Sequence, residues 1–224
     1  MKILAFDTTS STLSVALLQD QNPLSKITIF ENGKQVEILI PEIEKILHQN
    51  KIWYSDLDLI CATSGPGSFT GVRIGLTTAR SLKLATNLPL VLLNSLEAVA
   101  FKYRESKKII FVAIDARMDE FFIATFRTKN GKLTQLLAPR IATLEDVTNF
   151  IPSEDFLLCG SGKKIVSRIF SKKNIPHEIT SDEDVIEADL LGLLGLEKFS
   201  AGEKSTDNCD PIYLRSPKIS ERKK

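Results

Sequence analysis

A glycine-rich segment at residues 64–75, Ser-Gly-Pro-Gly-Ser-Phe-Thr-Gly-Val-Arg-Ile-Gly, contains the residue types of an anion-binding loop. It lies between an apolar run at 59–63, which predicts a strand, and a pattern over 70–86 that predicts a helix. Backbone N–H groups at such a turn and the positive end of the helix dipole point the same way. No Lys-Ser or Lys-Thr follows the turn, which excludes a Walker loop, and a tight connection that binds nothing is an equally good interpretation. The candidate nucleotide- or anion-binding residues here are Gly65, Gly67, Ser68 and Thr70.

Two aspartates, Asp7 and Asp115, end strand patterns that resemble each other. Each follows an apolar run, and each is followed eight and nine positions later by an apolar pair, at 15–16 and at 123–124. The two carboxylates could hold a magnesium ion that bridges nucleotide phosphates. We favour the alternative, in which they end their strands and accept backbone hydrogen bonds in the hairpin turns.

The repeated pattern indicates two related α/β halves. A second strand runs into glycines at 159–162, as the first does at 64–67. This arrangement is typical of the actin-like ATPase architecture (ASKHA, ribonuclease-H-like), a duplicated two-lobe α/β fold with phosphates in the cleft between the lobes. The second half is short after its glycine turn, so we expect a shortened second lobe. The charged run at 104–108 predicts the boundary, with an N-terminal lobe at 1–104 and a reduced C-terminal lobe with a basic tail at 105–224.

Strand and helix patterns alternate along both halves. In the first half we expect strands at 2–7, 13–19, 25–31, 59–63 and 90–93, and helices at 34–49, 70–86 and 96–104. In the second half we expect strands from 109 to about 143 and at 156, and helices at 144–150, 164–170 and 188–199.

Composition permits this fold and disfavours several other classes. The chain has 224 residues, is 43% hydrophobic and carries a net charge of +1, so nothing in its charge drives it toward nucleic acid or membranes. Its three cysteines, Cys61, Cys159 and Cys209, are widely spaced, which favours a reducing compartment over a disulfide framework. We see no secretory signal or membrane-span pattern and expect a cytoplasmic protein.

Four segments together resemble the TsaB family, also called YeaZ. They are residues 3–9, residues 64–75, Asp115-Ala-Arg117 with Glu120, and Pro211-Ile-Tyr-Leu-Arg215, and the glycine-rich block is the most specific of them. The resemblance implies an actin-like fold and a role in placing threonylcarbamoyladenosine on tRNAs that read codons starting with A. It implies a non-catalytic subunit that pairs with the larger paralogue TsaD, with TsaE as the accompanying ATPase. A separate enzyme would supply the threonylcarbamoyl-adenylate that the complex transfers to tRNA.

The resemblance also implies that this chain holds no metal. Proteins of the TsaD type carry a metal-binding His-x-x-x-His on a helix, and Ser95 and Val99 stand at the equivalent positions here. Neither residue type replaces an imidazole as a transition-metal ligand. The two histidines, His48 and His177, lie in different predicted lobes. We therefore expect no metal, and no cofactor beyond weak binding of ATP or ADP.

Two features near the ends of these patterns are less specific. Many relatives have a His-Ser pair at the start of the first helix, where this chain has Gly33-Lys-Gln-Val-Glu37. The tail at 215–224 has five positive charges and one negative. It could contact tRNA phosphates in an assembled complex, but we favour a solvated tail.

Two helices carry apolar residues on more than one side, which indicates a second buried contact. The family's pairing would place helices 34–49 and 70–86 against two helices of TsaD, and the same surface could form a two-fold homodimer when the partner is absent. The alternative is that another segment of the same chain covers the band. The predicted partner-binding residues are Val36, Ile38, Leu39, Ile46, Val72, Arg73, Ala79, Leu82 and Lys83.

Two functions therefore remain open from the sequence. The first is a catalytically silent scaffold that binds and activates a paralogous tRNA-modifying subunit through TsaD-like and TsaE-like partners. The second is an independent actin-like ATPase or small-molecule kinase that places Asp7, Ser68, Thr70 and Asp115 around a nucleotide. A peptidase finds little support, because no Gly-x-Ser-x-Gly elbow is present.

Overall fold

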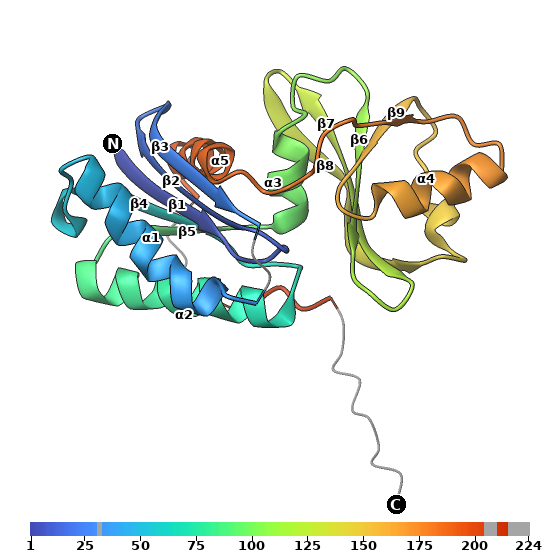
Figure 1. The fold of residues 1–224 in the computed structure, drawn as a ribbon. Helices are drawn as coiled ribbons and strands as arrows, with labels where there is room; N and C mark the ends of the chain where they lie inside the picture. The colour runs from blue at the N-terminus through green and yellow to red at the C-terminus, as the bar shows by residue number, and fades with distance from the viewer. Residues whose placement is uncertain (31–32, 204–209, 215–224) are drawn as a thin grey trace, which may run out of the picture.

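The computed structural model describes residues 1–30, 33–203 and 210–214, which form two α/β lobes side by side (Figure 1). In the first half of the chain the elements are β1 (Lys2–Asp7), β2 (Leu13–Gln19), β3 (Asn22–Ile29), α1 (Gln35–Gln49), a 3-10 turn (Tyr54–Asp56), β4 (Leu59–Thr63), α2 (Phe69–Thr86), β5 (Leu90–Leu93) and α3 (Ser95–Phe101). In the second half they are β6 (Ile109–Asp115), β7 (Glu120–Lys129), β8 (Lys132–Thr143), a 3-10 turn (Val147–Phe150), β9 (Phe156–Cys159), α4 (Lys163–Lys172), β10 (Glu178–Ile179) and α5 (Ala188–Ser200).

The two sheets have the same topology, as the repeated sequence pattern predicts. The first has the order β3-β2-β1-β4-β5 and the second the order β8-β7-β6-β9-β10. In each, the central strand pairs antiparallel with the strand that follows it and parallel with the strand that precedes the glycine-turn helix. The duplication predicted from the two Asp-ended patterns is therefore confirmed.

Alternation along β1 explains how the first sheet is covered on both faces. Leu4 and Phe6 belong to the core under α1 and α2, whereas Ile3 and Ala5 belong to the core under α5. Successive side chains of a strand point to opposite faces, so one strand contributes to both layers. Figure 1 shows α1 and α2 on one side of this sheet and α5 on the other.

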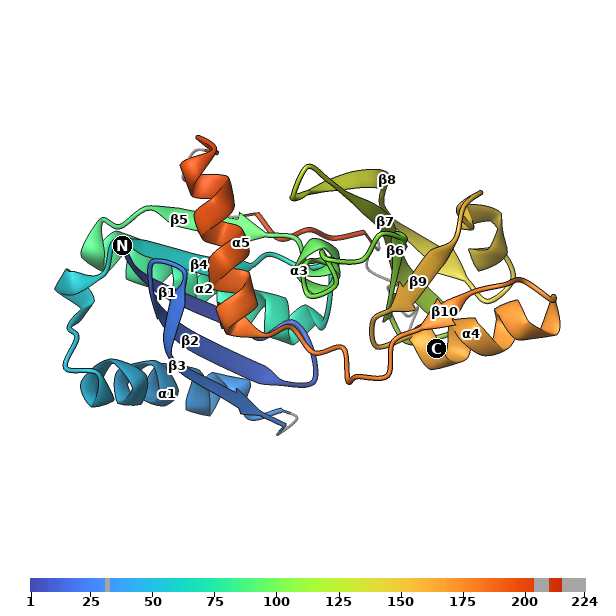
Figure 2. The same ribbon diagram turned by 90° about the horizontal axis from the view of Figure 1, so that it is seen from above.

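The last helix of each half of the chain packs on the sheet formed by the other half. Helix α5 packs on β1, β2 and β5 of the first sheet, and α3 packs on β6 and β7 of the second. In Figure 2 α5 crosses the first sheet and α3 lies between the lobes. The expected division at residue 104 separates the two sheets, but α5, which follows it in sequence, packs with the first sheet. One hydrophobic core therefore runs through both lobes.

The second lobe lacks a counterpart of α1. Only the 3-10 turn at Val147–Phe150 connects β8 to β9, where we expected a helix over 144–150. This turn is too short to cover a sheet face as α1 does, which confirms the shortened second lobe.

Candidate functional site

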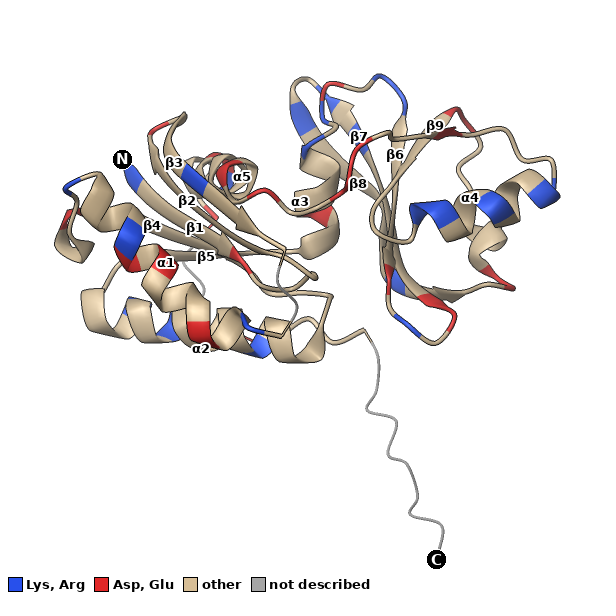
Figure 3. Cartoon of the chain, in the orientation of Figure 1, with Lys and Arg blue, Asp and Glu red and all other residues tan. Residues whose placement is uncertain are grey.

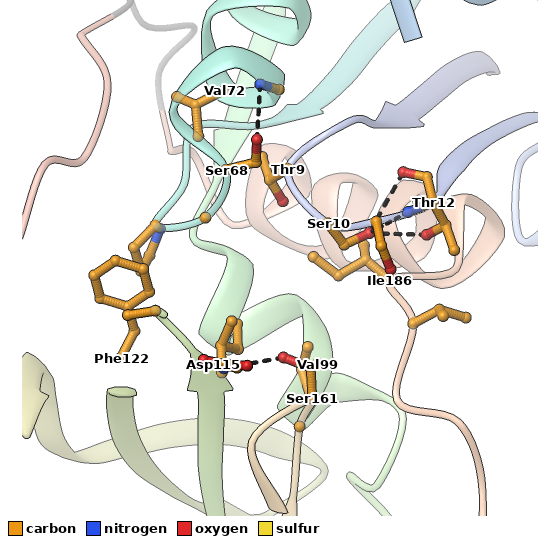
Figure 4. Close-up of a pocket in the computed structure, with 18 of the residues that line it drawn as sticks. Thr9, Ser10, Thr12, Ser68, Val72, Val99, Asp115, Phe122, Ser161 and Ile186 are labelled. Atoms are coloured by element: carbon orange, nitrogen blue, oxygen red, sulfur yellow. Dashed lines mark hydrogen bonds between the residues drawn. The ribbon is translucent and has the colours of Figure 1, made fainter. Parts of the chain in front are cut away.

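A cleft of about 1300 Å³ separates the lobes where the two hairpin turns and the two glycine turns face each other. Most of its lining comes from residues 9–12, 66–74, 114–118, 160–161, 163–164 and 181–186, with 212–214 at one side. Figure 4 shows Ser68 and Thr9 on one wall, and Asp115 and Ser161 on another. This is where the sequence pattern predicts a nucleotide or other anion.

The glycines of the first turn bring the backbone close to another part of the chain. An added Cβ at Gly67 would lie 2.4 Å from the carbonyl oxygen of Thr9, and one at Gly71 would lie 1.9 Å from that of Thr8. The Ser68 N–H donates to the Thr9 carbonyl at 2.7 Å, and the Thr8 hydroxyl donates to the Gly71 carbonyl at 2.7 Å. The close approach that glycine permits here is to the β1–β2 turn.

The start of α2 is capped by its own loop. Ser68 is the N-cap, and its Oγ accepts a hydrogen bond from the Gly71 N–H at 3.3 Å. Gly65 has a φ of +96°, and its carbonyl accepts from the Ser95 N–H at 2.8 Å. Gly67, Ser68 and Thr70 line the cleft, whereas Gly65 does not. Their binding of an anion stays a prediction.

Asp7 is fully buried and does not line the cleft. Burial raises the pKa of its carboxyl, while hydrogen bonds from Thr63 and Thr9 act in the opposite direction. Its Oδ1 accepts from the Thr9 backbone N–H at 3.1 Å and from the Thr9 hydroxyl at 2.6 Å. The Thr9 hydroxyl also lies 3.1 Å from the Ser95 hydroxyl, so a chain of polar groups joins β1 to α3.

Asp115 does line the cleft, in contrast to Asp7. Its Oδ1 accepts from the Arg117 N–H at 2.7 Å, and its own N–H donates to the Ser161 hydroxyl at 3.0 Å. The second glycine turn repeats the packing of the first, since a Cβ at Gly160 would lie 2.3 Å from the Ala113 carbonyl oxygen. Only one of the two aspartates predicted for a nucleotide site thus reaches the cleft.

Among the described residues, no group of three or more His, Cys, Asp and Glu side chains could hold a metal ion. Ser95 is buried at the start of α3, and Val99, one turn later, lines the cleft. His48 is exposed near the end of α1. His177 packs against Phe156, and its Nε2 lies 2.7 Å from the Ser167 hydroxyl.

A buried ion pair lies at the second glycine turn, and neither of its residues was expected at the site from the sequence. The Lys163 ammonium lies 2.8 Å from Asp184, and the two side chains are 7% and 0% exposed. Asp184 also accepts from the Gly160 N–H at 2.7 Å and from the Tyr103 hydroxyl. The pair fixes the 181–186 wall of the cleft to α4 and to the connection that follows α3. The only feature of the sequence that pointed to this ion pair is the position of Lys163 just after the glycines. No local feature pointed to Asp184.

The structure corrects which residues of α1 and α2 face outward. Leu39, Ile46, Val72 and Ala79, which we expected at a partner surface, are buried in the chain's own core. Helix α1 contacts the sheet and α2 as well, so its apolar band is covered on two sides without a partner. Val36 and Arg73 are exposed, and Ile38, Leu82 and Lys83 are half-buried. Ile40 and Leu84 also face outward, since they are 38% and 85% exposed.

The two helices differ in the charged residues that they carry (Figure 3). Helix α1 carries Glu37, Glu42 and Glu44 against one lysine, whereas α2 carries basic residues and no acidic one. The basic residues of α2 are Arg73, Arg80 and Lys83.

Two of the three cysteines lie in the described part of the chain. Cys61 and Cys159 are free and buried, and burial raises the pKa of both thiols, which makes them poor nucleophiles. Cys209 and the basic tail at 215–224 lie outside the described residues. Within the described part of the chain, no helix has the length and hydropathy needed to cross a bilayer.

Comparison of the sequence with known proteins gives consistent matches. The family model of TsaD, tRNA N6-adenosine threonylcarbamoyltransferase, matches residues 33–199. The TsaB protein of Escherichia coli, a tRNA threonylcarbamoyladenosine biosynthesis protein, is 33% identical over 96% of this chain and 95% of its own length. TsaB of Bacillus subtilis is 32% identical over 69% of this chain and 68% of its own length. A threonylcarbamoyltransferase of Methylobacterium nodulans is 42% identical over 34% of this chain and 22% of its own length.

Solved structures agree with these matches. YeaZ from Pseudomonas aeruginosa superposes with a TM-score of 0.81 and 27% identity, covering 95% of this chain and 99% of that one. The ROK hexokinase of Thermus thermophilus has a TM-score of 0.51 at 12% identity, covering 90% of this chain and 100% of that one, and this likeness concerns the fold alone. The actin-like fold class expected from the sequence is therefore confirmed.

Proposed function

Because this chain belongs to the TsaB family and acts in tRNA threonylcarbamoyladenosine biosynthesis, we propose that it is the non-catalytic subunit that activates a TsaD-type transferase by dimerising with it. In this role the chain contributes a surface, and the paralogous subunit contributes the site of threonylcarbamoyl transfer to adenosine.

The outer face of α1 and α2 carries this proposal. Val36 and Ile40 on α1 and Phe69 and Leu84 on α2 are 64%, 38%, 53% and 85% exposed. Apolar side chains gathered on neighbouring helices of a soluble lobe favour a docking surface over a solvated one. The acidic α1 and the basic α2 would select a partner whose helices carry the opposite charges at matching positions.

The geometry of the cleft supports a non-catalytic role. In an actin-like enzyme the hairpin and glycine turns would hold phosphates, but here Gly67 and Gly71 are packed against Thr8 and Thr9. Asp7 is buried behind them and engaged by threonine hydroxyls. We therefore expect weak binding of ATP or ADP in the cleft and no turnover by the chain alone.

The remaining partners follow from the same assembly. A TsaE-like ATPase and tRNA would join the chain through the heterodimer. Without its paralogue, the chain would pair with a second copy through α1 and α2, because the acidic α1 of one copy complements the basic α2 of the other.

Reconstitution tests this proposal. The purified chain, its organism's TsaD-type paralogue and the TsaE-type ATPase are combined with tRNA, ATP and threonylcarbamoyl-adenylate, and the modified nucleoside is quantified after digestion. We expect modification with all proteins present, none with this chain alone, and a 1:1 heterodimer by light scattering. An ATPase activity of the isolated chain that survives repurification and is lost in Asp7→Asn would instead support the enzyme hypothesis.

A further inference from the structure

The described C-terminal segment, Pro211–Leu214, returns to the first lobe beside the glycine-rich turn (Figure 1). The Ile212 N–H donates to the carbonyl of Ser64 at 2.8 Å, directly after β4. The Ile212 carbonyl oxygen would lie 3.2 Å from a Cβ at Gly65, so the two backbones are in close contact. We call this segment the C-terminal clip.

The clip places Tyr213 against the first two turns of α2. The rings of Tyr213 and Phe69 lie 5.6 Å apart between centroids, at an interplanar angle of 33°. The guanidinium carbon of Arg73 lies 3.7 Å from the centroid of the Phe69 ring. The Arg73 Nε donates to the Tyr213 hydroxyl at 3.2 Å. Two separate contacts therefore hold one arginine side chain in place.

All three side chains of this stack remain open to solvent. Phe69 is 53% exposed and Tyr213 is 47% exposed, and Arg73 is exposed as well. None of the ion pairs among the described residues involves Arg73. Its Nε is used by Tyr213, whereas its terminal NH₂ groups carry the donors that match a carboxylate.

The contacts with Phe69 and Tyr213 restrict the Arg73 side chain before any partner binds. An exposed guanidinium ordinarily keeps its rotamer freedom. A side chain that is already fixed loses less on binding, so its hydrogen bonds add more to affinity. Tyr and Arg anchors surrounded by apolar groups are typical of the residues that dominate protein interfaces.

The surroundings of the stack favour a protein over RNA as the occupant. Phe30 and Val36, which are 63% and 64% exposed, line the same cleft as Phe69, Arg73 and Tyr213. Such an apolar rim would exclude water from a carboxylate paired with Arg73, and the patch continues the outer face of α1 and α2. An RNA phosphate would instead favour further cations beside Arg73. The other basic residues that line this cleft, Arg117, Lys163 and Lys164, come from the second lobe.

We propose that the C-terminal clip is part of the docking surface, with Tyr213 as the positioning residue that orients Arg73 toward a carboxylate on the paralogous subunit. The inference rests on the proposed function and adds to it the strongest contact of that interface. Binding energy would then concentrate at the N-terminal ends of α1 and α2, with the mid-helix residues contributing less.

A double-mutant cycle on heterodimer affinity tests the inference with the full chain and its TsaD-type partner. Arg73→Ala should weaken binding about 30-fold, as loss of a central interface arginine does. Tyr213→Phe keeps the ring and removes only the hydroxyl acceptor, and should weaken binding about 5-fold. In the Arg73→Ala background, Tyr213→Phe should have no further effect. Arg168→Ala, a change to an exposed arginine on α4 of the second lobe, is the matched control and should change affinity less than 3-fold.

The outcomes separate the two proposals. If the unmodified chain does not bind the partner, the proposed function and this inference both fail. If it binds but Arg73→Ala and Tyr213→Phe leave the affinity unchanged, the inference is wrong and the proposed function stands. Equal effects of Tyr213→Phe in both backgrounds would show that Tyr213 does not act through Arg73. Weaker tRNA binding by an intact Arg73→Ala heterodimer would assign the stack to RNA and overturn the inference.

Discussion

The carbonyl oxygen of Thr8 lies only 1.9 Å from the position that a Cβ at Gly71 would occupy. Gly71 is the third residue of α2, and Thr8 begins the turn after β1. Gly71 therefore allows the start of α2 to pack closely against the hairpin turn. This packing explains a glycine at position 71 without phosphate binding.

Gly71→Ala should destabilise the chain by more than about 3 kcal/mol, because a backbone carbonyl cannot move aside as a flexible side chain can. Chemical denaturation followed by circular dichroism measures the change. Thr77→Ala, an exposed substitution on the same helix, should change stability by less than about 0.5 kcal/mol. A stable, well-folded Gly71→Ala variant would show that the turn can open.

The buried pair of Lys163 and Asp184 gives a second stability prediction. Asp184→Asn keeps the side-chain shape but removes the negative charge that pairs with the Lys163 ammonium, at a cost of about 3–5 kcal/mol. The exposed pair of Arg127 and Glu154 is a matched control, and Arg127→Ala should cost less than about 1 kcal/mol. Equal losses for the two variants in urea denaturation would contradict the assigned role of Lys163 and Asp184.

The burial of Asp7 predicts a pH dependence. Burial raises the pKa of its carboxyl above the ordinary value of 3.8, so the native state favours the protonated acid. The stability that the Asp7 carboxyl contributes is present below pH 3.8 and is lost as the pH rises through the native pKa. Asn can keep an oxygen at the Oδ1 position, where Thr9 and Thr63 donate. Asp7→Asn should therefore become more stable relative to the unmodified chain as the pH rises above 3.8.

Asp20 provides the control of opposite sign. A hydrogen bond from the N-terminal amine lowers the pKa of its carboxyl, so its contribution is present above 3.8 and is lost as the pH falls. Free energies of unfolding measured between pH 3 and pH 8 for both Asp→Asn variants should diverge in opposite directions. A flat difference for Asp7→Asn would show that the burial of Asp7 does not govern its titration.

Much of the fold could be predicted from local patterns, and the outward faces of the helices could not. The apolar alternation placed β1 and β2 at their observed bounds. In α2, however, the buried stripe includes Gly71 and Gly75, which carry no hydropathy signal. The pattern of larger residues alone therefore does not predict which side of α2 is buried, nor that Leu84 is 85% exposed.

Contacts between segments that lie far apart in the sequence could not be predicted from local sequence patterns. Arg73 and Tyr213 are 140 residues apart in sequence, and the residues around either one do not predict their contact. The motif containing Tyr213 supported the family resemblance without indicating where it packs. Asp184 lies in an irregular segment whose composition resembles a solvated loop, and only the fold brings it to Lys163.

The residues that stand where TsaD-type proteins have their metal-binding histidines predict the metal content. Ser95 is buried with its hydroxyl 3.1 Å from that of Thr9, and Val99 has no ligand atom. We expect no stoichiometric zinc or iron in the purified chain. Elemental analysis after a chelator wash measures this, and one retained transition-metal ion per chain would contradict it.

The outer face of α1 and α2 gives the final prediction. Ile40→Lys and Leu84→Glu introduce charges at exposed apolar positions, so they should leave the unfolding temperature nearly unchanged. Both should weaken the homodimer and the heterodimer by at least about tenfold, because an unpaired charge would be buried on docking. Ile165→Lys, at a comparably exposed position on α4 that is 41% exposed, is the control and should bind normally. Unchanged sedimentation and partner affinity in Ile40→Lys and Leu84→Glu would assign the interface to another surface.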